Sequence, residues 1–442
     1  MAASVLRSSQ TAPACNEDWL AGARAGHDAE FPAWLDRQQN SEAPSFDSVV
    51  IRGSGVSALT CAARLARSSN LRGRVLVAGE RPSESPKLIN GCTLRARSLD
   101  YLAAAVGQSP ERILDILLGD LAPQARSTRQ FFSMFSDASR GYETIRLAEF
   151  MPQSASRGAY AYGLRNSRLV GGLTELTDEL GLHWTDGKEV SLADCRAAGS
   201  GDSPFVVNGS HQPLEGAPQS TPPAAFVVAW QCTMKRRADS VLPVAGSMIA
   251  GIRQPAGIDI GVFYPFADPL TRDADAYGLF YRVVHPDSGY QKEDVIEEMR
   301  AHVLGVGASI GWELVDEDRA AAGAQVPGFA WSDVENTLPD YFDLHRTFGA
   351  GLPIITGCGM TRGALAGWLT AESLMRGEPP ATPVNRSLHR WRRLNRGFCA
   401  GMEDRTGIAA ALLNRFPARL VGLLADRRDV WASVHGGRQS VE

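Results

Sequence analysis

The hydrophobic pattern in the first part of the chain predicts a strand, a tight turn, a helix and a second strand in close succession. Residues 48–51 form a short, mostly aliphatic run, which is typical of a strand buried in a parallel sheet. A Gly-x-Gly-x-x-Ala turn at residues 53–58 follows, and residues 59–66 continue in a helical pattern. A second aliphatic run, residues 74–79, ends at Glu80. This order of elements is that of a dinucleotide-binding α/β unit.

The turn carries the residue types that a bound dinucleotide requires. Gly53 permits the sharp turn after the strand, and Gly55 lets backbone N–H groups approach a pyrophosphate at the helix N-terminus. Ala58 is small enough for the helix to pack closely on the sheet. Val56 and Ser57, at the start of the helix, complete the cofactor-binding positions that we expect in this turn.

The residues after the second strand indicate which dinucleotide is bound. Glu80 stands 25 positions after Gly55, where an acidic side chain accepts hydrogen bonds from the adenosine ribose. The pair Glu80-Arg81 resembles the Glu-Arg that ends the second strand in FAD-dependent monooxygenases of the p-hydroxybenzoate hydroxylase type, in which the arginine lies along the cofactor. The resemblance implies FAD rather than NAD as the cofactor.

Two later segments extend the resemblance to this superfamily. Residues 357–368 are similar to the Gly-x-Gly segment that opens its flavin-proximal helix, which places Gly357, Gly359 and Met360 at the cofactor. A helix N-terminus in that place would stabilise negative charge on the reduced flavin. Arg168 begins a segment that resembles the superfamily's Arg-x-x-Leu-x-x-x-Leu helix, in which the arginine faces the flavin region.

One motif of the superfamily is missing, and its absence bears on the expected affinity. Members carry a Gly-Asp-Ala stretch shortly before the flavin-proximal helix, and its aspartate binds the ribityl chain, whereas residues 346–351 contain no acid. Asp340 or Asp343 could reach in from upstream. Otherwise we expect weak FAD binding, in the micromolar range or looser, because a charge-assisted hydrogen bond contributes about 1.5–3 kcal/mol. The alternative is a degenerate relative that has lost FAD and serves as a non-catalytic subunit.

The pattern beyond residue 220 predicts an antiparallel sheet. Runs rich in Val, Ile, Phe and Tyr occur at residues 225–232, 247–252, 258–263 and 277–284, separated by turn residues. In flavoproteins of the styrene-monooxygenase and hydroxylase branches, the sheet that covers the substrate is inserted in this place, and an aromatic-rich sheet would suit an apolar or aromatic substrate. Its aromatic residues include Trp230, Phe263, Tyr264, Phe266, Phe280 and Tyr281.

Two further segments carry specific expectations. Residues 110–140 are predicted to be helical, including Phe131, Phe132 and Phe135. The glycine-rich residues 305–311 follow a helical run rather than a strand, so we interpret them as a loop and not as a second nucleotide site. Electrons would then come from transiently bound NAD(P)H or from a separate flavin reductase.

Composition and charge narrow the class of protein. The chain has 442 residues, a net charge of −4 and a pI near 6.1, which argues against nucleic acid or an anionic membrane as the main partner. It shows neither an apolar run of transmembrane length nor a signal peptide, and its seven cysteines lack disulfide or zinc spacing, so we expect a cytoplasmic protein without a metal.

These observations combine into one expected architecture, an α/β protein with a Rossmann-like FAD-binding domain, an inserted antiparallel substrate domain and a helical C-terminal tail. The expected boundaries are an N-terminal extension over 1–45, the FAD domain over 46–220 and 338–380, the substrate domain over 221–337 and terminal helices over 381–442.

The chain resembles the styrene-monooxygenase and geranylgeranyl-reductase branches of this superfamily. The resemblance implies FAD-dependent monooxygenation of a small, largely apolar or aromatic molecule in secondary metabolism, with reduction of a lipid-like double bond as the alternative. No catalytic side chain stands out, and His211, His285 and His345 are the histidines nearest the segments of interest.

Overall fold

The computed structural model describes parts of a compact unit that spans Glu42–Ser440. The described residues are 46–68, 71, 73–79, 81, 91–118, 129–135, 142, 148–150, 161–210, 212–218, 226–244, 246–254, 257–266, 275–284, 289, 291–315, 321–322, 326–327, 337–344, 359–377 and 380. The predicted N-terminal extension and C-terminal helices lie outside these residues.

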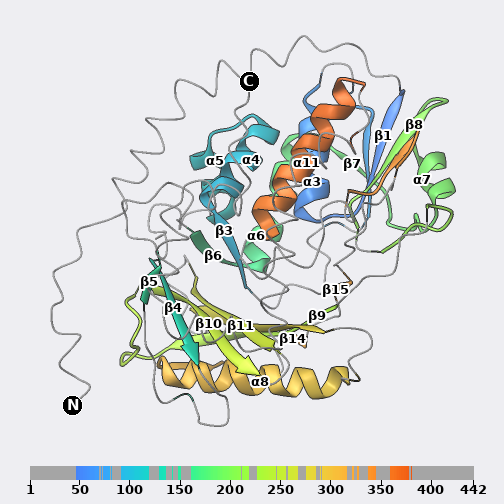
Figure 1. Cartoon of the computed structure of the whole chain (residues 1–442). Helices are drawn as coiled ribbons and strands as arrows, with labels where there is room; N and C mark the ends of the chain where they lie inside the picture. The colour runs from blue at the N-terminus through green and yellow to red at the C-terminus, as the bar shows by residue number, and fades with distance from the viewer. Residues whose placement is uncertain are drawn as a thin grey trace. The chain divides into compact units, whose positions relative to one another are not determined.

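The described helices and strands alternate through the first half of the chain and then give way to a run of strands (Figure 1). The helices are α3 (Val56–Ala66), α4 (Ala96–Val106), α5 (Pro110–Leu118), α6 (Asn166–Glu179), α7 (Leu192–Ala198), α8 (Lys292–Ser309) and α11 (Gly359–Met375). The strands are β1 (Ser48–Arg52), β2 (Val75–Ala78), β3 (Gly91–Arg95), β4 (Arg129–Phe135), β5 (Ala148–Phe150), β6 (Ala161–Arg165), β7 (His183–Trp184), β8 (Pro204–Asn208), β9 (Phe226–Arg236), β10 (Gly246–Gln254), β11 (Gly257–Pro265), β12 (Ala276–Val284), β13 (Trp312–Leu314), β14 (Ala321–Ala322), β15 (Val326–Pro327), β16 (Thr337–Leu338) and β17 (Tyr341–Phe342).

A mainly parallel sheet forms the first layer, in the order β16-β17-β8-β1-β2-β7. β1 pairs in parallel with β2 on one side and with β8 on the other, and β17 continues the parallel pairing beyond β8. All five residues of β1 are buried, as its aliphatic run predicts for a central strand. The predicted order of strand, turn, helix and strand is therefore confirmed.

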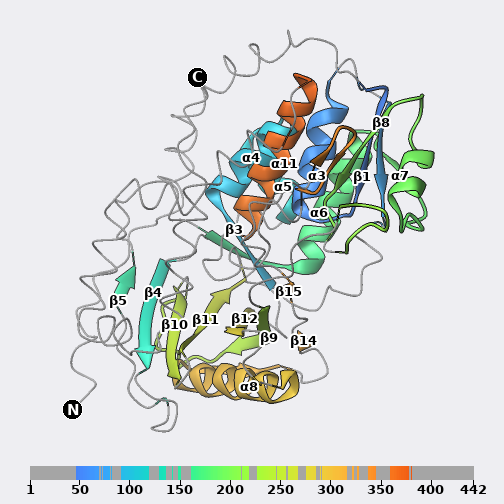
Figure 2. The same ribbon diagram turned by 45° about the vertical axis from the view of Figure 1, so that its right-hand side comes forward.

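Helices α3 and α11 pack unusually closely against each other, and Figures 1 and 2 both show them side by side. A Cβ on Gly363 would lie 3.4 Å from the backbone nitrogen of Ser57, and a Cβ on Gly367 would overlap the Ser57 carbonyl and lie 3.0 Å from the Cys61 nitrogen. The two glycines, one helical turn apart on α11, therefore let the two backbones approach. Because residue numbers rise together along both helices, α3 and α11 run parallel.

An antiparallel sheet forms the second layer, in the order β13-β9-β12-β11-β10-β4-β5. β9, β12, β11 and β10 pair antiparallel as the sequence predicts, whereas β4 joins β10 in parallel. Helix α8 covers one face of this sheet (Figures 1 and 2), where it packs on a cluster that includes Trp230, Phe263 and Phe280. The opposite face carries a second cluster, with Tyr264, Phe266 and Tyr277. Alternation along the strands thus divides the aromatic residues between two environments.

Two predictions about secondary structure are wrong. The segment predicted as a helix over 110–140 contains the helix α5, which ends at Leu118, and the strand β4. The aromatic residues Phe131, Phe132 and Phe135 therefore lie on a strand, because tertiary pairing with β10 favours the extended backbone that bulky aromatic residues also prefer.

The glycine-rich segment 305–311 is not a loop either, since α8 continues to Ser309. A Cβ on Gly305 would overlap the ring of Tyr142, and a Cβ on Gly307 would overlap the Met234 side chain. The glycines thus serve helix packing, and the turn comes only at Gly311, where φ is 78°.

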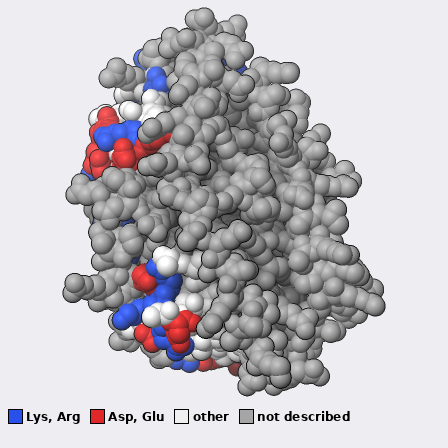
Figure 3. Space-filling view, turned by 90° about the vertical axis from the view of Figure 1, so that its left-hand side faces the viewer, with Lys and Arg blue, Asp and Glu red and all other residues white. Residues whose placement is uncertain are grey.

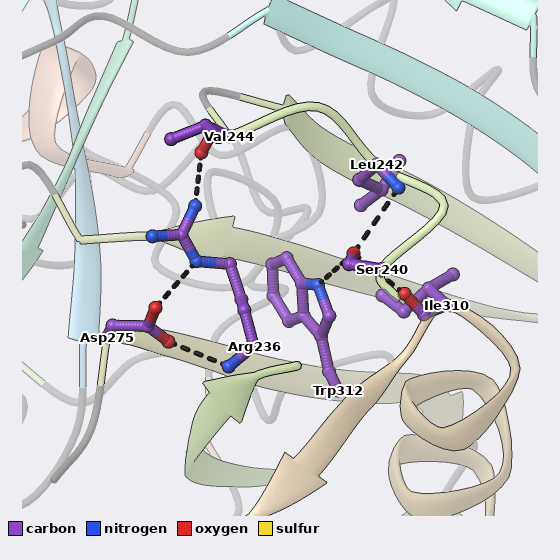
Figure 4. Close-up of polar contacts among 7 residues, drawn as sticks. All are labelled: Arg236, Ser240, Leu242, Val244, Asp275, Ile310 and Trp312. Carbon is purple, nitrogen blue, oxygen red and sulfur yellow. Dashed lines mark hydrogen bonds and ion pairs between the residues drawn. The ribbon is translucent and has the colours of Figure 1, made fainter. Parts of the chain in front are cut away.

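The connection between β9 and β10 is held by polar contacts around Ser240 (Figure 4). The Ser240 hydroxyl accepts a hydrogen bond from the Trp312 indole N–H at 3.1 Å and donates one to the Ile310 carbonyl at 2.8 Å. Arg236 binds Asp275 at 2.9 Å and also donates to the Val244 carbonyl. These contacts fix this end of the antiparallel sheet against the end of α8.

The described surface carries charges of both signs. On the face shown in Figure 3, described acidic and basic side chains lie interspersed, as is typical of a solvated surface. Among the described helices, none combines the length and the apolar character needed to cross a membrane.

Candidate cofactor site

The carboxyl ends of three parallel strands meet at the Gly53 turn. The Gly53 N–H donates to the Ala78 carbonyl at 2.8 Å, and the Gly209 N–H donates to the Arg52 carbonyl at 2.8 Å. Gly53 has φ 107°, and a Cβ there would lie 2.9 Å from the Ser210 nitrogen. Only glycine fits this position without strain, so the turn has the shape that the Gly-x-Gly-x-x-Ala pattern predicts.

The N-terminus of α3 opens directly beyond this turn. Its first turn carries no acidic side chain, and its N-cap residue Gly55 provides no side-chain cap. A Cβ built on Gly55 would meet no atom within 4 Å, so the space above this backbone is open among the described residues. Uncapped N–H groups and the helix dipole together favour an anion in such a place.

The remaining turn residues have packing roles. Val56 begins α3, and its carbonyl accepts a hydrogen bond from the Thr60 hydroxyl at 2.6 Å. Ser57 is buried against α11. Ala58 is fully buried, and a Cβ on Gly209 would lie 2.7 Å from the Ala58 Cβ, which shows how closely α3 approaches β8. Small residues at both positions are therefore required for this approach.

Helix α11 begins at the same end of the structure as α3. Gly363 lies level with Ser57 at the start of α3, so the first residue of α11, Gly359, stands about one helical turn before it. Two parallel helix N-termini therefore lie at the carboxyl edge of the parallel sheet. Both would contribute positive potential to an anionic ligand bound there.

A buried carboxylate stands at the same edge. β17 is in register with β8, with Phe342 opposite Val207, so Asp343 lies level with Asn208 at the end of β8. Asn208 in turn lies opposite Arg52, the residue before Gly53. Asp343 is only 1% exposed, and its Oδ2 accepts hydrogen bonds from Tyr341 Oη at 3.1 Å and from Asn208 Nδ2 at 3.3 Å.

Asp340, the other upstream aspartate, lies elsewhere. It precedes β17, about 10 Å of extended chain from Asp343. Its carboxylate is partly exposed and accepts a hydrogen bond from Arg196 Nη2 of α7 at 2.8 Å. The structure therefore brings Asp343, and not Asp340, to the edge that carries the Gly53 turn.

The other predicted cofactor residues are only partly described. Glu80 and Gly357 lie outside the described residues. Arg81 is exposed and forms an ion pair with Asp178 of α6 at 3.5 Å.

The predicted helix over 168–176 is confirmed as α6, with Arg168 exposed in its first turn. Gly359 and Met360 form the start of α11, as the resemblance implies.

The three histidines singled out from the sequence, His211, His285 and His345, lie outside the described residues. The structure instead buries His302 of α8 in a polar chain. His302 Nδ1 is 2.7 Å from Tyr142 Oη, and Nε2 is 3.1 Å from the Asp259 carboxylate, which also binds Arg282 through two contacts of 2.7 Å. These residues lie on the α8 face of the sheet. A single histidine in a helix gives no signal in the sequence.

The second layer approaches the first through β6. Gly163 of β6 forms an isolated bridge with Phe266, and a Cβ on Gly163 would overlap the Pro265 carbonyl. The Arg165 guanidinium carbon lies 5.3 Å from the centre of the Phe266 ring. The sheet face opposite α8, with its stacked pair Tyr264 and Tyr277, is therefore the face in contact with β6.

The architecture is similar to that of several solved structures, although the sequence resembles no known family closely enough to match it. No protein-family profile matches the chain, and no curated protein matches its sequence. Among solved structures, HpxO of Klebsiella pneumoniae in complex with FAD and uric acid is 12% identical, with a TM-score of 0.52 over 88% of this chain and 97% of HpxO. A variant of HpxO in complex with FAD is also 12% identical to this chain, with a TM-score of 0.54 over 88% of this chain and 99% of the variant. MibH, a lathipeptide tryptophan 5-halogenase, is 16% identical to this chain, with a TM-score of 0.51 over 90% of this chain and 86% of MibH.

The chain shares its fold with HpxO, which was solved with FAD, and with the halogenase MibH. The resemblance drawn from the short motifs is confirmed at this level, as is the α/β class with a parallel and an antiparallel sheet. At this degree of identity the likeness shows the fold alone.

Proposed function

We propose that the protein is an FAD-dependent oxidoreductase that oxidises a small, largely apolar or aromatic molecule, with monooxygenation as the favoured reaction. The observation that carries this proposal is the convergence of an uncapped α3 N-terminus, the Gly53 turn and the buried Asp343 at one sheet edge. An anion site and a hydroxyl-binding carboxylate side by side suit a dinucleotide that has both pyrophosphate and polyol groups. HpxO, which shares the fold, was solved with FAD.

The described residues fit this cofactor. Open space beyond Gly55 leaves room for a pyrophosphate against the backbone. The N-terminus of α11 would face the flavin end, where its dipole favours negative charge. Bound FAD would supply the redox chemistry, which explains why no nucleophile or acid–base pair is prominent in the sequence.

Asp343 is proposed to do the work of the aspartate that is missing from residues 346–351. It reaches the sheet edge from β17, so a hydroxyl of the ribityl chain could donate to it. If so, the affinity lost with the missing motif is recovered, and FAD should bind more tightly than the micromolar range that the sequence suggests. Burial of the carboxylate strengthens such a contact because water competes less.

The substrate class is inferred from the antiparallel sheet. The face opposite α8 carries Val262, Tyr264, Phe266 and Tyr277, with the half-buried Ile249 and Leu279 beside them. An apolar layer of this kind excludes water and favours apolar or aromatic molecules. Trp230, Phe263 and Phe280 are assigned to the core under α8 and not to the substrate.

The proposal is tested by flavin titration followed by turnover. Purified protein is stripped of ligand and titrated with oxidised and reduced FAD by anaerobic calorimetry, with NAD⁺ as the control dinucleotide. We expect saturable binding of FAD at one site and no binding of NAD⁺. Absence of binding of either FAD form would overturn the proposal and favour the non-catalytic subunit.

Turnover assays then distinguish monooxygenation from reduction of a double bond. With bound FAD, aromatic candidate substrates are screened for oxygen consumption, with electrons from NAD(P)H or from flavin reduced beforehand. Substrate-dependent oxygen consumption with incorporation of ¹⁸O from ¹⁸O₂ supports monooxygenation. Oxidation of reduced flavin by an alkene without oxygen would instead support the reductase.

A further inference from the structure

Arg52 is a buried cation that has no carboxylate partner among the described residues. It ends β1, directly before Gly53, and is 8% exposed. Its guanidinium donates to four oxygens, all neutral. These are Glu189 O at 3.0 Å, Gln212 O at 2.7 Å, Gln212 Oε1 at 3.4 Å and Asn208 Oδ1 at 3.5 Å. Within the described part of the chain, no carboxylate lies at ion-pair distance from Arg52.

Burying the charge of Arg52 at this position costs free energy. The three residues before it, Val49, Val50 and Ile51, are aliphatic and fully buried, so an apolar side chain would fit the end of this strand at no electrostatic cost. A buried arginine held only by neutral oxygens is less stable than one paired with an anion. Its presence therefore calls for an anion that is close by but not in direct contact.

Asn208 connects Arg52 to that anion. Its Oδ1 faces Arg52 Nη1, and its Nδ2 donates to Asp343 Oδ2 at 3.3 Å and to the Gln212 carbonyl at 3.3 Å. Arginine can only donate and a carboxylate can only accept, so the Asn208 amide has one orientation that satisfies both. The Ser210 N–H also donates to Asn208 Oδ1, at 3.3 Å, so Arg52 and this backbone amide together keep the Asn208 oxygen away from Asp343.

We propose that Arg52 is a positioning residue of the cofactor site, which acts through Asn208 to hold the Asp343 carboxylate at the sheet edge. The proposal deepens the function proposed above and rests on it. Arg52 ends β1, Asn208 ends β8 and Asp343 directly follows β17, so the chain of contacts also aligns the strand ends around the Gly53 turn. The ligand that benefits is a dinucleotide with a polyol hydroxyl opposite Asp343, that is, FAD.

The test is a double-mutant cycle with two readouts. Arg52→Met, Asp343→Asn and the double variant are compared with the wild-type protein for FAD affinity by calorimetry and for urea unfolding of the apoprotein. Arg236→Met is the matched control, because Arg236 is a largely buried arginine bound to Asp275 in the antiparallel sheet. It should lose stability and keep its FAD affinity.

We expect Arg52→Met to weaken FAD binding about tenfold, the scale of one hydrogen bond to a charged group. In the Asp343→Asn background the same substitution should have little further effect, because Arg52 acts through Asp343. Asn208→Ala should reproduce the loss, and it replaces Arg52→Met in the cycle if that variant does not fold.

Two outcomes overturn the proposal separately from the proposed function. If Arg52→Met and Asp343→Asn weaken FAD binding independently, so that their effects multiply, Arg52 does not act through Asp343. If their effects on urea unfolding are also additive, the contact chain through Asn208 does not couple them at all. A wild-type protein that binds no FAD would contradict the proposed function, while the unfolding cycle would still decide whether Arg52 and Asp343 are coupled.

Discussion

Arg64 of α3 and Glu372 of α11 form a buried ion pair, with 2.6 Å between Arg64 Nε and Glu372 Oε1, although 308 positions separate them in the chain. Both side chains are less than a tenth exposed. The pair joins the last turns of the two helices whose first turns stand at the candidate cofactor site. It therefore helps to set the parallel alignment on which that site depends.

Removing one member of this pair should be more harmful than removing both. Glu372→Ala leaves the Arg64 charge buried without its carboxylate and should lower the free energy of unfolding by about 3–5 kcal/mol. Arg64→Met combined with Glu372→Leu keeps the volume apolar and should cost much less. Urea unfolding of the three variants measures this, and a double variant less stable than Glu372→Ala would contradict the interpretation.

The two glycines of the turn should respond in opposite ways. Gly53→Ala forces a side chain onto a φ of 107° and against Ser210, so it should destabilise the fold by about 1–3 kcal/mol. A Cβ on Gly55 meets no atom within 4 Å, so Gly55→Val should leave the melting temperature nearly unchanged, yet block FAD because the side chain fills the pyrophosphate space. Thermal melts and flavin titration measure both, and stoichiometric flavin in Gly55→Val would refute the assigned binding position.

Asp343 and Asp340 form a matched pair for testing the cofactor site. Asp343→Asn keeps the shape and removes the charge at the sheet edge, so FAD affinity should fall about ten- to a hundredfold. Asp340→Asn removes a charge of the same kind from the partly exposed pair with Arg196 and should not change FAD affinity. Calorimetric titration of both variants with FAD shows which aspartate contributes to binding. A larger loss of affinity in Asp340→Asn would assign the cofactor-binding carboxylate to Asp340 instead of Asp343.

Buried thiols should make the protein less stable in alkali. Burial raises the pKa of the Cys232 thiol from its ordinary value of 9.0 to about 12. Between these two values the unfolded chain has released the proton and the folded protein still holds it, so stability falls as the pH rises above 9. The slope from this residue is about 1.4 kcal/mol per pH unit. Urea unfolding at several pH values should show a steeper decline in the wild type than in Cys232→Ala, and equal slopes would contradict the prediction.

The local elements of the nucleotide-binding unit could be predicted from the residue pattern alone. The aliphatic run of β1, the Gly53 turn and the start of α3 lie within a few positions of one another, so the residues that determine these elements are all found in one short segment. The alternating strands β9 to β12 were predictable for the same reason, because side-chain alternation is a property of neighbouring residues. These elements were enough to indicate the class of fold.

Contacts between residues that are distant in the chain followed from how the strands pair and the helices pack. Arg52 and Asn208 end two strands and Asp343 follows a third, and their contacts depend on the registers of β1, β8 and β17, which no local pattern specifies. Pairing with β10 likewise made residues 129–135 a strand instead of part of a helix. The packing of α8 on one face of the antiparallel sheet determined which aromatic residues lie beneath it, because a face of a sheet is buried or exposed only by what packs on it.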